Sequence, residues 1–235
     1  PIGTAPNITD AQVISQINVF NQDFRNLIGT PGGMNSTGLA VDSEINFCLA
    51  NQDENGNLTS GINRVNIGQD GVYGASSGAA LSAMNALKPN SQWDPTKYMN
   101  MWSVKFTGSA SSLLGYAQFP DNTPGLGGIN PSGGAANTDG VVAAYHTFGS
   151  SDYDDGTFIL NAPYDKGRTM THEVGHWLGL RHIWGDNSSC TNGDFCADTP
   201  DATGSNGSCI TVDSCPSDGL GNDQVQNYMD YTNDS

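Results

Sequence analysis

The most informative stretch of the chain is residues 172–182, which read HEVGHWLGLRH. His172 and His176 are four residues apart, so on a helix both rings leave from one face and can bind the same metal ion. Gly179 allows the backbone to turn after this helix, and His182 can then return as a third nitrogen ligand. Three imidazoles and one open position are typical of catalytic zinc, because structural zinc has protein ligands at all four positions.

Glu173 follows the first of these histidines. On a helix it is displaced by about 100° from His172, so its carboxylate can reach the open side of the same ion and take a proton from a water there. The alternative is a set of surface histidines beside an incidental glutamate, but the pattern H-E-x-x-H-x-x-G-x-x-H fixes five of eleven positions. His146 lies outside this pattern, and a structural role in a strand explains it more simply.

The composition indicates a chain with a hydrophobic core and argues against binding to nucleic acid and membranes. The chain has 235 residues, enough for a hydrophobic core, and 24 acidic residues against 8 basic ones give a formal net charge of −16. Such a charge repels nucleic acid phosphates and anionic membranes and attracts cations. No apolar run approaches the roughly 18 to 20 residues that cross a bilayer. We therefore expect that the chain binds neither nucleic acid nor membranes. We also expect a monomer.

Turn-rich stretches join the predicted elements, and no repeat or linker divides the chain. A capping box at Thr9 and apolar residues at helical spacing predict a helix over 10–27. Similar patterns predict helices over 79–87 and 166–180 and strands over 45–50, 98–106, 113–119 and 141–148. Residues 120–140, rich in Gly, Pro and Asn, predict a long surface loop. We expect one domain over 1–235, with an α/β part at 1–179 and a smaller irregular part at 180–235.

Residues after the third histidine add a second motif. Residues 227–231 read NYMDY, and together with GLRHIWGD at 179–186 and DTP at 198–200 they resemble the metzincin metallopeptidases. More narrowly, the chain resembles the pappalysin family and its ulilysin-like secreted branch. The resemblance extends to 47–50, 61–65, 114–117 and 140–142 and so covers most of the chain. It implies a metzincin-type α+β zincin: a twisted mixed sheet with an active-site helix, and a smaller irregular C-terminal subdomain below the cleft.

The resemblance implies a secreted zinc endopeptidase. Zinc held by His172, His176 and His182 would activate a water, with Glu173 as general base. Tyr231 matches a family tyrosine near the metal that could stabilise the oxyanion or complete the coordination, and Met229 would form an apolar floor under the zinc. Ordinary core packing is the alternative for Met229, and simple packing is the alternative for Tyr231. A catalytically silent zinc-binding or adhesion module is the alternative function, which Glu173 argues against.

The resemblance also implies how a substrate binds. A protein or peptide substrate would add as an extended strand to the edge strand at 113–116, with the loop at 120–140 bordering the cleft. The segment 232–235 would line the pocket for the residue that follows the scissile bond. Asp234 is a candidate acid for a preference for Arg or Lys in that pocket, and the preference itself stays open.

Acidic residues gather at 194–201, where Asp194, Asp198, Thr199 and Asp201 lie within eight residues. A solvated acidic loop is one reading of this cluster. Calcium is the other, because it takes six to eight oxygen ligands from carboxylates, hydroxyls and carbonyls. Ulilysin-like relatives carry structural calcium in this region, so the resemblance favours a calcium site built on Asp198 and Thr199.

Four of the five cysteines lie within 26 polar residues, which is typical of disulfides formed in an oxidising compartment. The resemblance pairs Cys190 with Cys215. Cys48 and Cys196 both depart from the apolar residues usual in relatives, which suggests a second bridge between them. Cys209 is then left over, and its family partner would lie just past Ser235, so we expect a C-terminal segment to be missing.

Overall fold

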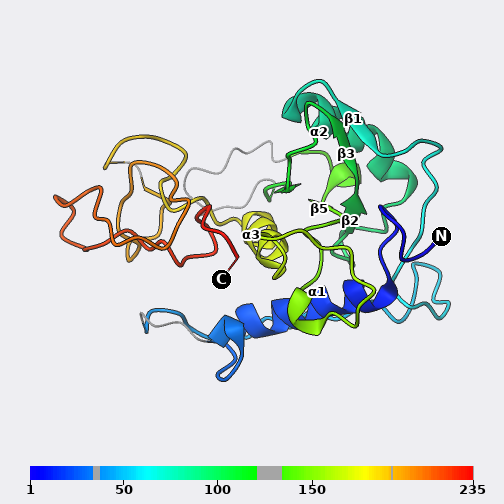
Figure 1. The fold of residues 1–235 in the computed structure, drawn as a ribbon, viewed down its shortest axis with the longest axis horizontal. Coiled ribbons are helices and arrows are strands. Elements are labelled where there is room, and N and C mark those ends of the chain that lie inside the picture. Colours follow the sequence, from blue (N-terminus) through cyan, green and yellow to red (C-terminus); the bar gives the residue numbers. More distant parts are fainter. Residues whose placement is uncertain (34–37, 121–133, 192, 235) are drawn as a thin grey trace.

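The computed structural model describes residues 1–33, 38–120, 134–191 and 193–234. These residues form three α-helices and five strands (Figure 1). The helices are α1 (Asp10–Asp23), α2 (Ser77–Leu87) and α3 (Arg168–Trp177), and the strands are β1 (Val72–Gly74), β2 (Met101–Val104), β3 (Phe106–Gly108), β4 (Gly115–Ala117) and β5 (Val141–Ala144). None of these helices is long and apolar enough to span a membrane.

Helix α1 begins at the predicted cap. The side chain of Thr9 accepts a hydrogen bond from the backbone N–H of Gln12, 3.2 Å away, which satisfies one of the free donors of the first turn. The helix ends at Asp23, earlier than predicted, because Asn26 takes a left-handed φ of 43°. One face is buried, and Phe20 on it is fully shielded from solvent.

The central sheet has three strands in the order β2-β5-β4. Strand β5 pairs in parallel with β2, and antiparallel with β4 through the pair Tyr116↔Val142. All four β5 side chains are buried, alternately toward α1 with α3 and toward α2. Strand β4 therefore lies at one edge of a mixed sheet, as the metzincin-type fold class requires, while β1 and β3 form a separate parallel pair.

The structure corrects two predicted strands and adds one that the sequence did not predict. Residues 45–50 do not form a strand, because the side chain of Asn21 on α1 satisfies the backbone N–H and C=O of Phe47 at 2.8 and 2.9 Å. The strand predicted over 98–106 is divided at Lys105 into β2 and β3. Strand β1 was not predicted, since three residues give no readable alternation. Most of the loop predicted over 120–140 lies outside the described residues.

We call residues 1–179 the N-terminal region and residues 180–235 the C-terminal region. The described part of the C-terminal region contains no helix or strand, and it forms the loops at the left of Figure 1. Its small apolar cluster comprises Ile183, Ala202 and Met229, with Trp184 packed against it. Its chain is also fastened by a disulfide between the predicted pair Cys190 and Cys215, with an S–S distance of 2.03 Å.

The predicted disulfide between Cys48 and Cys196 is wrong. Both are free cysteines, as is Cys209. Cys48 follows Phe47, which packs on α1, whereas the backbone of Cys196 is bonded to Asp194 in the C-terminal region. The two thiols therefore belong to different parts of the molecule, and a disulfide needs Cα atoms within about 7 Å.

Candidate active site

Helix α3 carries His172, Glu173 and His176, and residues 168–176 of it are all buried. The helix follows Gly167, whose φ is 82°, and no side chain at that position caps it. Instead the carboxylate of Asp234 accepts hydrogen bonds from the backbone N–H groups of Lys166 and Arg168, at 2.7 and 3.2 Å. Asp234 thus caps the start of α3, and it is not among the residues that line the cavity described below.

The turn after α3 brings the third histidine back to the other two. Gly179 has a φ of 103°, as its predicted role in the turn requires. One ring nitrogen from each of His172, His176 and His182 lies within 4.8 Å of the others, and the Nε2 atoms of His176 and His182 are 3.1 Å apart. The structure therefore brings the three predicted zinc ligands to one point.

Each of these rings is oriented by an oxygen on its far side. Nδ1 of His172 lies 2.6 Å from the carbonyl of Tyr228, and Nδ1 of His176 lies 2.8 Å from the carbonyl of Leu180. Nδ1 of His182 faces the carboxylate of Asp186. A carbonyl can only accept, so Nδ1 carries the proton and Nε2 offers its lone pair. Burial, with His176 nearby, lowers the pKa of His172 to about 3, and burial lowers that of His176 to about 4, so both rings are neutral as metal ligands must be.

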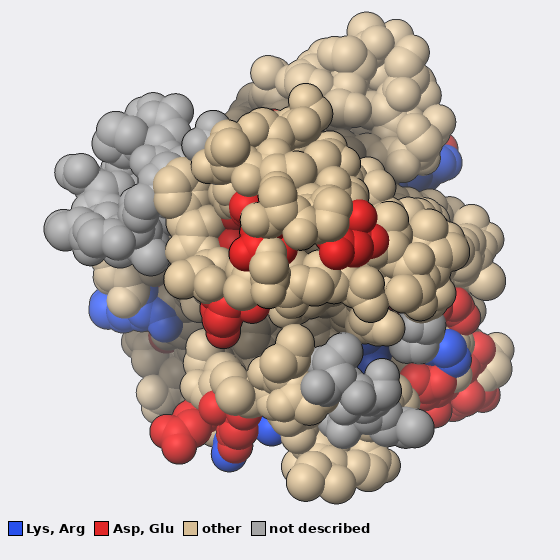
Figure 2. Space-filling model, turned by 90° about the vertical axis from the view of Figure 1, so that its left-hand side faces the viewer, with Lys and Arg blue, Asp and Glu red and all other residues tan. Residues whose placement is uncertain are grey.

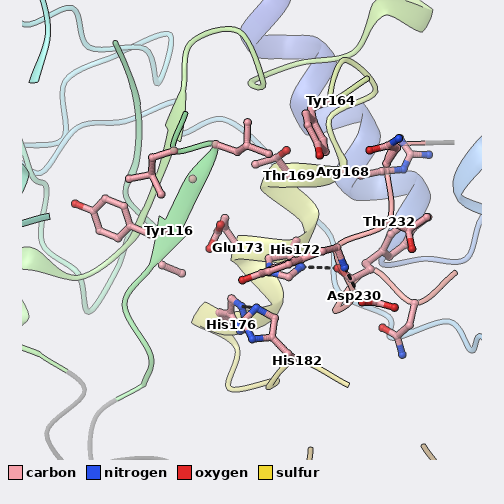
Figure 3. A pocket seen from close by; sticks show the side chains of 18 of the residues that line it. Tyr116, Tyr164, Arg168, Thr169, His172, Glu173, His176, His182, Asp230 and Thr232 are labelled. Carbon is pink, nitrogen blue, oxygen red and sulfur yellow. Dashed lines mark hydrogen bonds between the residues drawn. The ribbon is translucent and has the colours of Figure 1, made fainter. Parts of the chain in front are cut away.

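Glu173 lies on the side of the histidines that faces β4 (Figure 3). A Cβ added to Gly115 would lie 3.0 Å from Cγ and 3.1 Å from Oε1 of Glu173, so a larger residue there would push this side chain by a few tenths of an ångström. Burial raises the pKa of Glu173 to about 8, because the charged form loses its hydration. The carboxylate is thus held at the edge strand as a base stronger than an exposed glutamate.

A cavity of about 540 Å³ lies over these groups, between the edge strand β4 and the segment that contains the motif at 227–231, which we call the methionine turn. Strand β4 supplies one wall and residues 225–233 supply the opposite wall. The lining residues nearest the start of α3 are Tyr164, Arg168 and Thr169. The three histidines and Glu173 form its floor, so an extended molecule along β4 would pass directly over them.

Tyr231 lies beside His172 and His182, and Met229 packs against helix α3. Met229 is buried. A Cβ added to Gly175 of α3 would lie only 2.4 Å from the Sδ atom of Met229, so the segment around Met229 packs directly against the helix. The ring of Tyr231 lies 5.6 Å from that of His172 and 4.9 Å from that of His182, between ring centroids. Its side chain is 52% exposed, and burial of the remainder raises its pKa.

Comparisons with known proteins identify the family and the fold. Residues 126–235 match the model of peptidase family M43, described as pregnancy-associated plasma protein-A. The chain is 30% identical over 234 residues to an extracellular metalloprotease of Arthroderma otae, covering 99% of this chain and 67% of that protein. The chain belongs to the pappalysin family. It is therefore a metalloendopeptidase of the metzincin group, a hydrolase of peptide bonds.

Solved structures of pappalysin-family members agree with this membership. Mature mirolysin of Tannerella forsythia in complex with a cleaved peptide is 39% identical, with a TM-score of 0.75, covering 97% of this chain and 78% of that one. A promirolysin mutant of the same organism, also 39% identical, gives a TM-score of 0.76 and covers 98% of this chain and 70% of that one. The chain spans about two thirds of the length of the curated relatives that match all of it.

Sequence reasoning missed several residues that complete this pappalysin site. Trp184 stacks on His182 with ring centroids 4.3 Å apart and planes 5° apart, and Phe119 lies 5.1 Å from the ring of His176. The only signal for Trp184 was an aromatic residue two positions after the third histidine. The hydrogen bond from His172 to the carbonyl of Tyr228 left no sequence signal, because any residue has a carbonyl.

Figure 2 shows the left-hand side of Figure 1, where Asp and Glu lie near the centre and at the lower margins, and Lys and Arg lie only at the margins. Asp194 accepts a bond from the backbone of Cys196 at 2.8 Å, and burial raises the pKa of this carboxyl. Among the described residues, the three histidines are the one group of His, Cys, Asp or Glu whose ligand atoms converge. Calcium at Asp198 and Thr199 stays a prediction.

Proposed function

We propose that the chain is the catalytic part of a secreted zinc endopeptidase, with Glu173 as general base. The observation that carries this proposal is the place of the Glu173 carboxylate, buried between three convergent imidazoles and a sheet edge that can receive a peptide. Secretion is supported by the extracellular relatives and by the Cys190–Cys215 disulfide.

The donor set suits zinc. Three imidazole nitrogens on a helix and the turn after it, each ring held by an oxygen on its other side, match the requirements of a catalytic zinc site with an open position. Bound there, zinc would supply a Lewis acid that polarises the scissile carbonyl and lowers the pKa of water toward about 7.

The chain's own residues perform the remaining steps. Glu173 takes a proton from the attacking water and later delivers it to the leaving amine. The hydroxyl of Tyr231 donates to the developing oxyanion from the opposite wall, and its raised pKa keeps it protonated. A protein or peptide substrate extends along β4, whose outer edge pairs with no other strand of the described residues and offers backbone groups for a further strand. The complex of mirolysin with a cleaved peptide supports this substrate class.

A structural calcium ion at Asp198 and Thr199 belongs to the same proposal. A ligand that binds only the native state raises the melting temperature with its concentration. Removing calcium with a calcium-selective chelator, which leaves zinc in place, should therefore lower the melting temperature and expose the acidic loop at 194–201 to self-cleavage. A melting curve that does not move across a calcium titration would leave the loop merely solvated.

The test of the proposed function compares two glutamine variants. Glu173→Gln should retain about one zinc per chain, while cleavage of casein falls by at least the roughly hundred- to ten-thousandfold typical of a lost general base. Glu44→Gln, on the exposed surface, is the matched control and should cleave as the wild type does. Glu173→Gln with bound zinc and unchanged turnover would refute the role of Glu173. A zinc-loaded wild type that cleaves nothing would favour the silent binding module.

A further inference from the structure

Asp23, the last residue of α1, is a buried carboxylate outside the catalytic cavity. Its side chain is fully shielded from solvent, yet three residues from around the zinc site converge on it. The hydroxyl of Thr171 donates to Oδ2 at 2.6 Å, and the hydroxyl of Tyr228 donates to Oδ1 at 3.1 Å. Nη2 of Arg168 lies 3.3 Å from Oδ1. A buried carboxylate with this many donors fixes the elements that carry them.

Tyr228 connects this carboxylate to a zinc ligand. Its hydroxyl is held by Asp23, and its main-chain carbonyl accepts the Nδ1 hydrogen of His172 at 2.6 Å. The guanidinium of Arg168 lies 5.8 Å from the centre of the Tyr228 ring and further limits its movement. Both ends of Tyr228 are therefore fixed, one by α1 and the other by the ring of His172.

Thr171 connects Asp23 to His172 by a second route, because Thr171 directly precedes His172 on α3 and donates a hydrogen bond to Asp23. One carboxylate thus fixes both the helix that carries His172 and the residue that sets the plane of its ring. We propose that Asp23 is a positioning residue for the zinc ligand His172, acting through Tyr228. This inference rests on the proposed function, in which His172 binds zinc.

A purely structural role for Asp23 is the alternative, and stability alone cannot separate the two. Removing the carboxylate would leave Arg168 as an unpaired buried charge, a change that can unfold a protein. Tyr228→Phe is the sharper variant. It deletes the hydroxyl that reaches Asp23, while the Asp23–Arg168 pair and the carbonyl behind His172 both remain.

The experiment measures zinc affinity, by competition with a chromophoric chelator, together with kcat and KM for a peptide substrate. Tyr228→Phe should weaken zinc binding about tenfold, at the low end of the 10- to 100-fold usual for residues behind a metal ligand. It should lower kcat and leave KM within about twofold. Tyr98→Phe is the matched control, because it also loses a hydroxyl hydrogen bond, to the carbonyl of Gln52 at 3.2 Å, and should match the wild type in all three quantities.

Asp23→Asn adds a second measurement. If it folds, it should weaken zinc binding at least as much as Tyr228→Phe. Zinc affinity and kcat of Tyr228→Phe within twofold of the wild type would overturn the role of Asp23, even if the melting temperature falls. In that case a wild type that still binds zinc and depends on Glu173 keeps the proposed function intact. A wild type that binds no zinc would overturn both.

Discussion

The two walls of the catalytic cavity are built by different kinds of interaction. The N-terminal region holds β4 and α3 on two apolar clusters that meet at the buried strand β5. The C-terminal region has a cluster of only three buried apolar residues. Buried carboxylates hold much of it instead: Asp230 accepts from Asn206 at 2.8 and 3.0 Å, and Asp223 accepts from Ser214 at 3.0 and 2.8 Å.

Because of this difference, we expect the part of the site in the N-terminal region to be more rigid than the part in the C-terminal region. Packing holds the backbone of α3, which carries His172, Glu173 and His176, whereas His182 and Tyr231 lie in the C-terminal region and depend on polar contacts such as the bond between His182 and Asp186. Apolar burial is cooperative across a core, while hydrogen bonds in loops can open locally. We therefore expect damage to the N-terminal region to unfold the whole chain and damage to the C-terminal region to loosen it locally.

The largest effect on stability should come from Phe20→Ala. Phe20 is fully buried, and its ring lies 5.0 Å from that of Phe47 and 6.3 Å from that of Phe24. Truncating a buried phenylalanine costs about 3–5 kcal/mol, so urea unfolding should show a cooperative loss of this size. Ile14→Ala on the exposed face of α1 is the control and should change little. A loss confined to hydrogen exchange of α1 would contradict a shared core.

A smaller, local effect should follow from Cys190→Ser combined with Cys215→Ser. The bridge closes a loop with a sequence separation of 25 residues, for which the chain-entropy model gives about 3 kcal/mol. We expect faster hydrogen exchange and proteolytic cutting between residues 190 and 215, with the amides of α1 and β5 still protected. Cys209→Ser, which removes a free and exposed thiol, is the control. Equal loss of protection in both regions would show that they unfold as one unit.

The pH dependence of stability tests the contact between the two regions at Asp23, which accepts a hydrogen bond from Tyr228. Burial raises the pKa of Asp23 from 3.8 to about 6, against the opposing effect of Arg168. The folded state then binds the proton of Asp23 more tightly than the unfolded state does. The protonated carboxyl therefore adds to the free energy of unfolding below pH 3.8, and this added stability is lost as the pH rises through about 6. The difference between the two values corresponds to about 3 kcal/mol, since one pKa unit is worth ~1.4 kcal/mol.

The measurement compares wild type with Asp23→Asn by urea unfolding between about pH 4 and about pH 7.5, a range that spans the titration of this carboxyl. The wild-type free energy of unfolding should fall relative to that of the variant as the pH rises. Glu173, which also has a raised pKa, titrates in both proteins and cancels in the difference. A constant difference across this range would mean that Asp23 stays ionised throughout.

The comparison between the regions also explains how far the sequence could be read. The ligand set and the start of α1 follow from spacing and from a cap, which are local signals. The bond between Tyr228 and Asp23 joins residues 205 positions apart and leaves no such signal. Phe47 was misassigned to a strand because its apolar neighbours suit a sheet, whereas Asn21 satisfies its backbone from a helix. Irregular regions held by side-chain bonds are therefore the least predictable.

The smallest expected effect concerns how the two main helices begin. Helix α1 is capped by its own neighbour Thr9, while α3 has no cap of its own and receives the carboxylate of Asp234 from the C-terminal region. Thr9→Ala and Asp234→Ala should each lower the free energy of unfolding by about 1 kcal/mol, the usual cost of a lost cap. Only Asp234→Ala should also raise hydrogen exchange at the start of α3, because only there does the cap cross between regions.

Cleavage preference provides a second readout for the same pair. Because Asp234 bonds the backbone of Lys166 and Arg168, its loss should leave the preference for the residue after the scissile bond as it is in the wild type. Profiling both variants against a peptide library checks this, with Thr9→Ala as the variant remote from the cavity. If Asp234→Ala alone lost a preference for Arg or Lys, the carboxylate would have to reach the substrate, and its bond to α3 would have to break when a peptide binds.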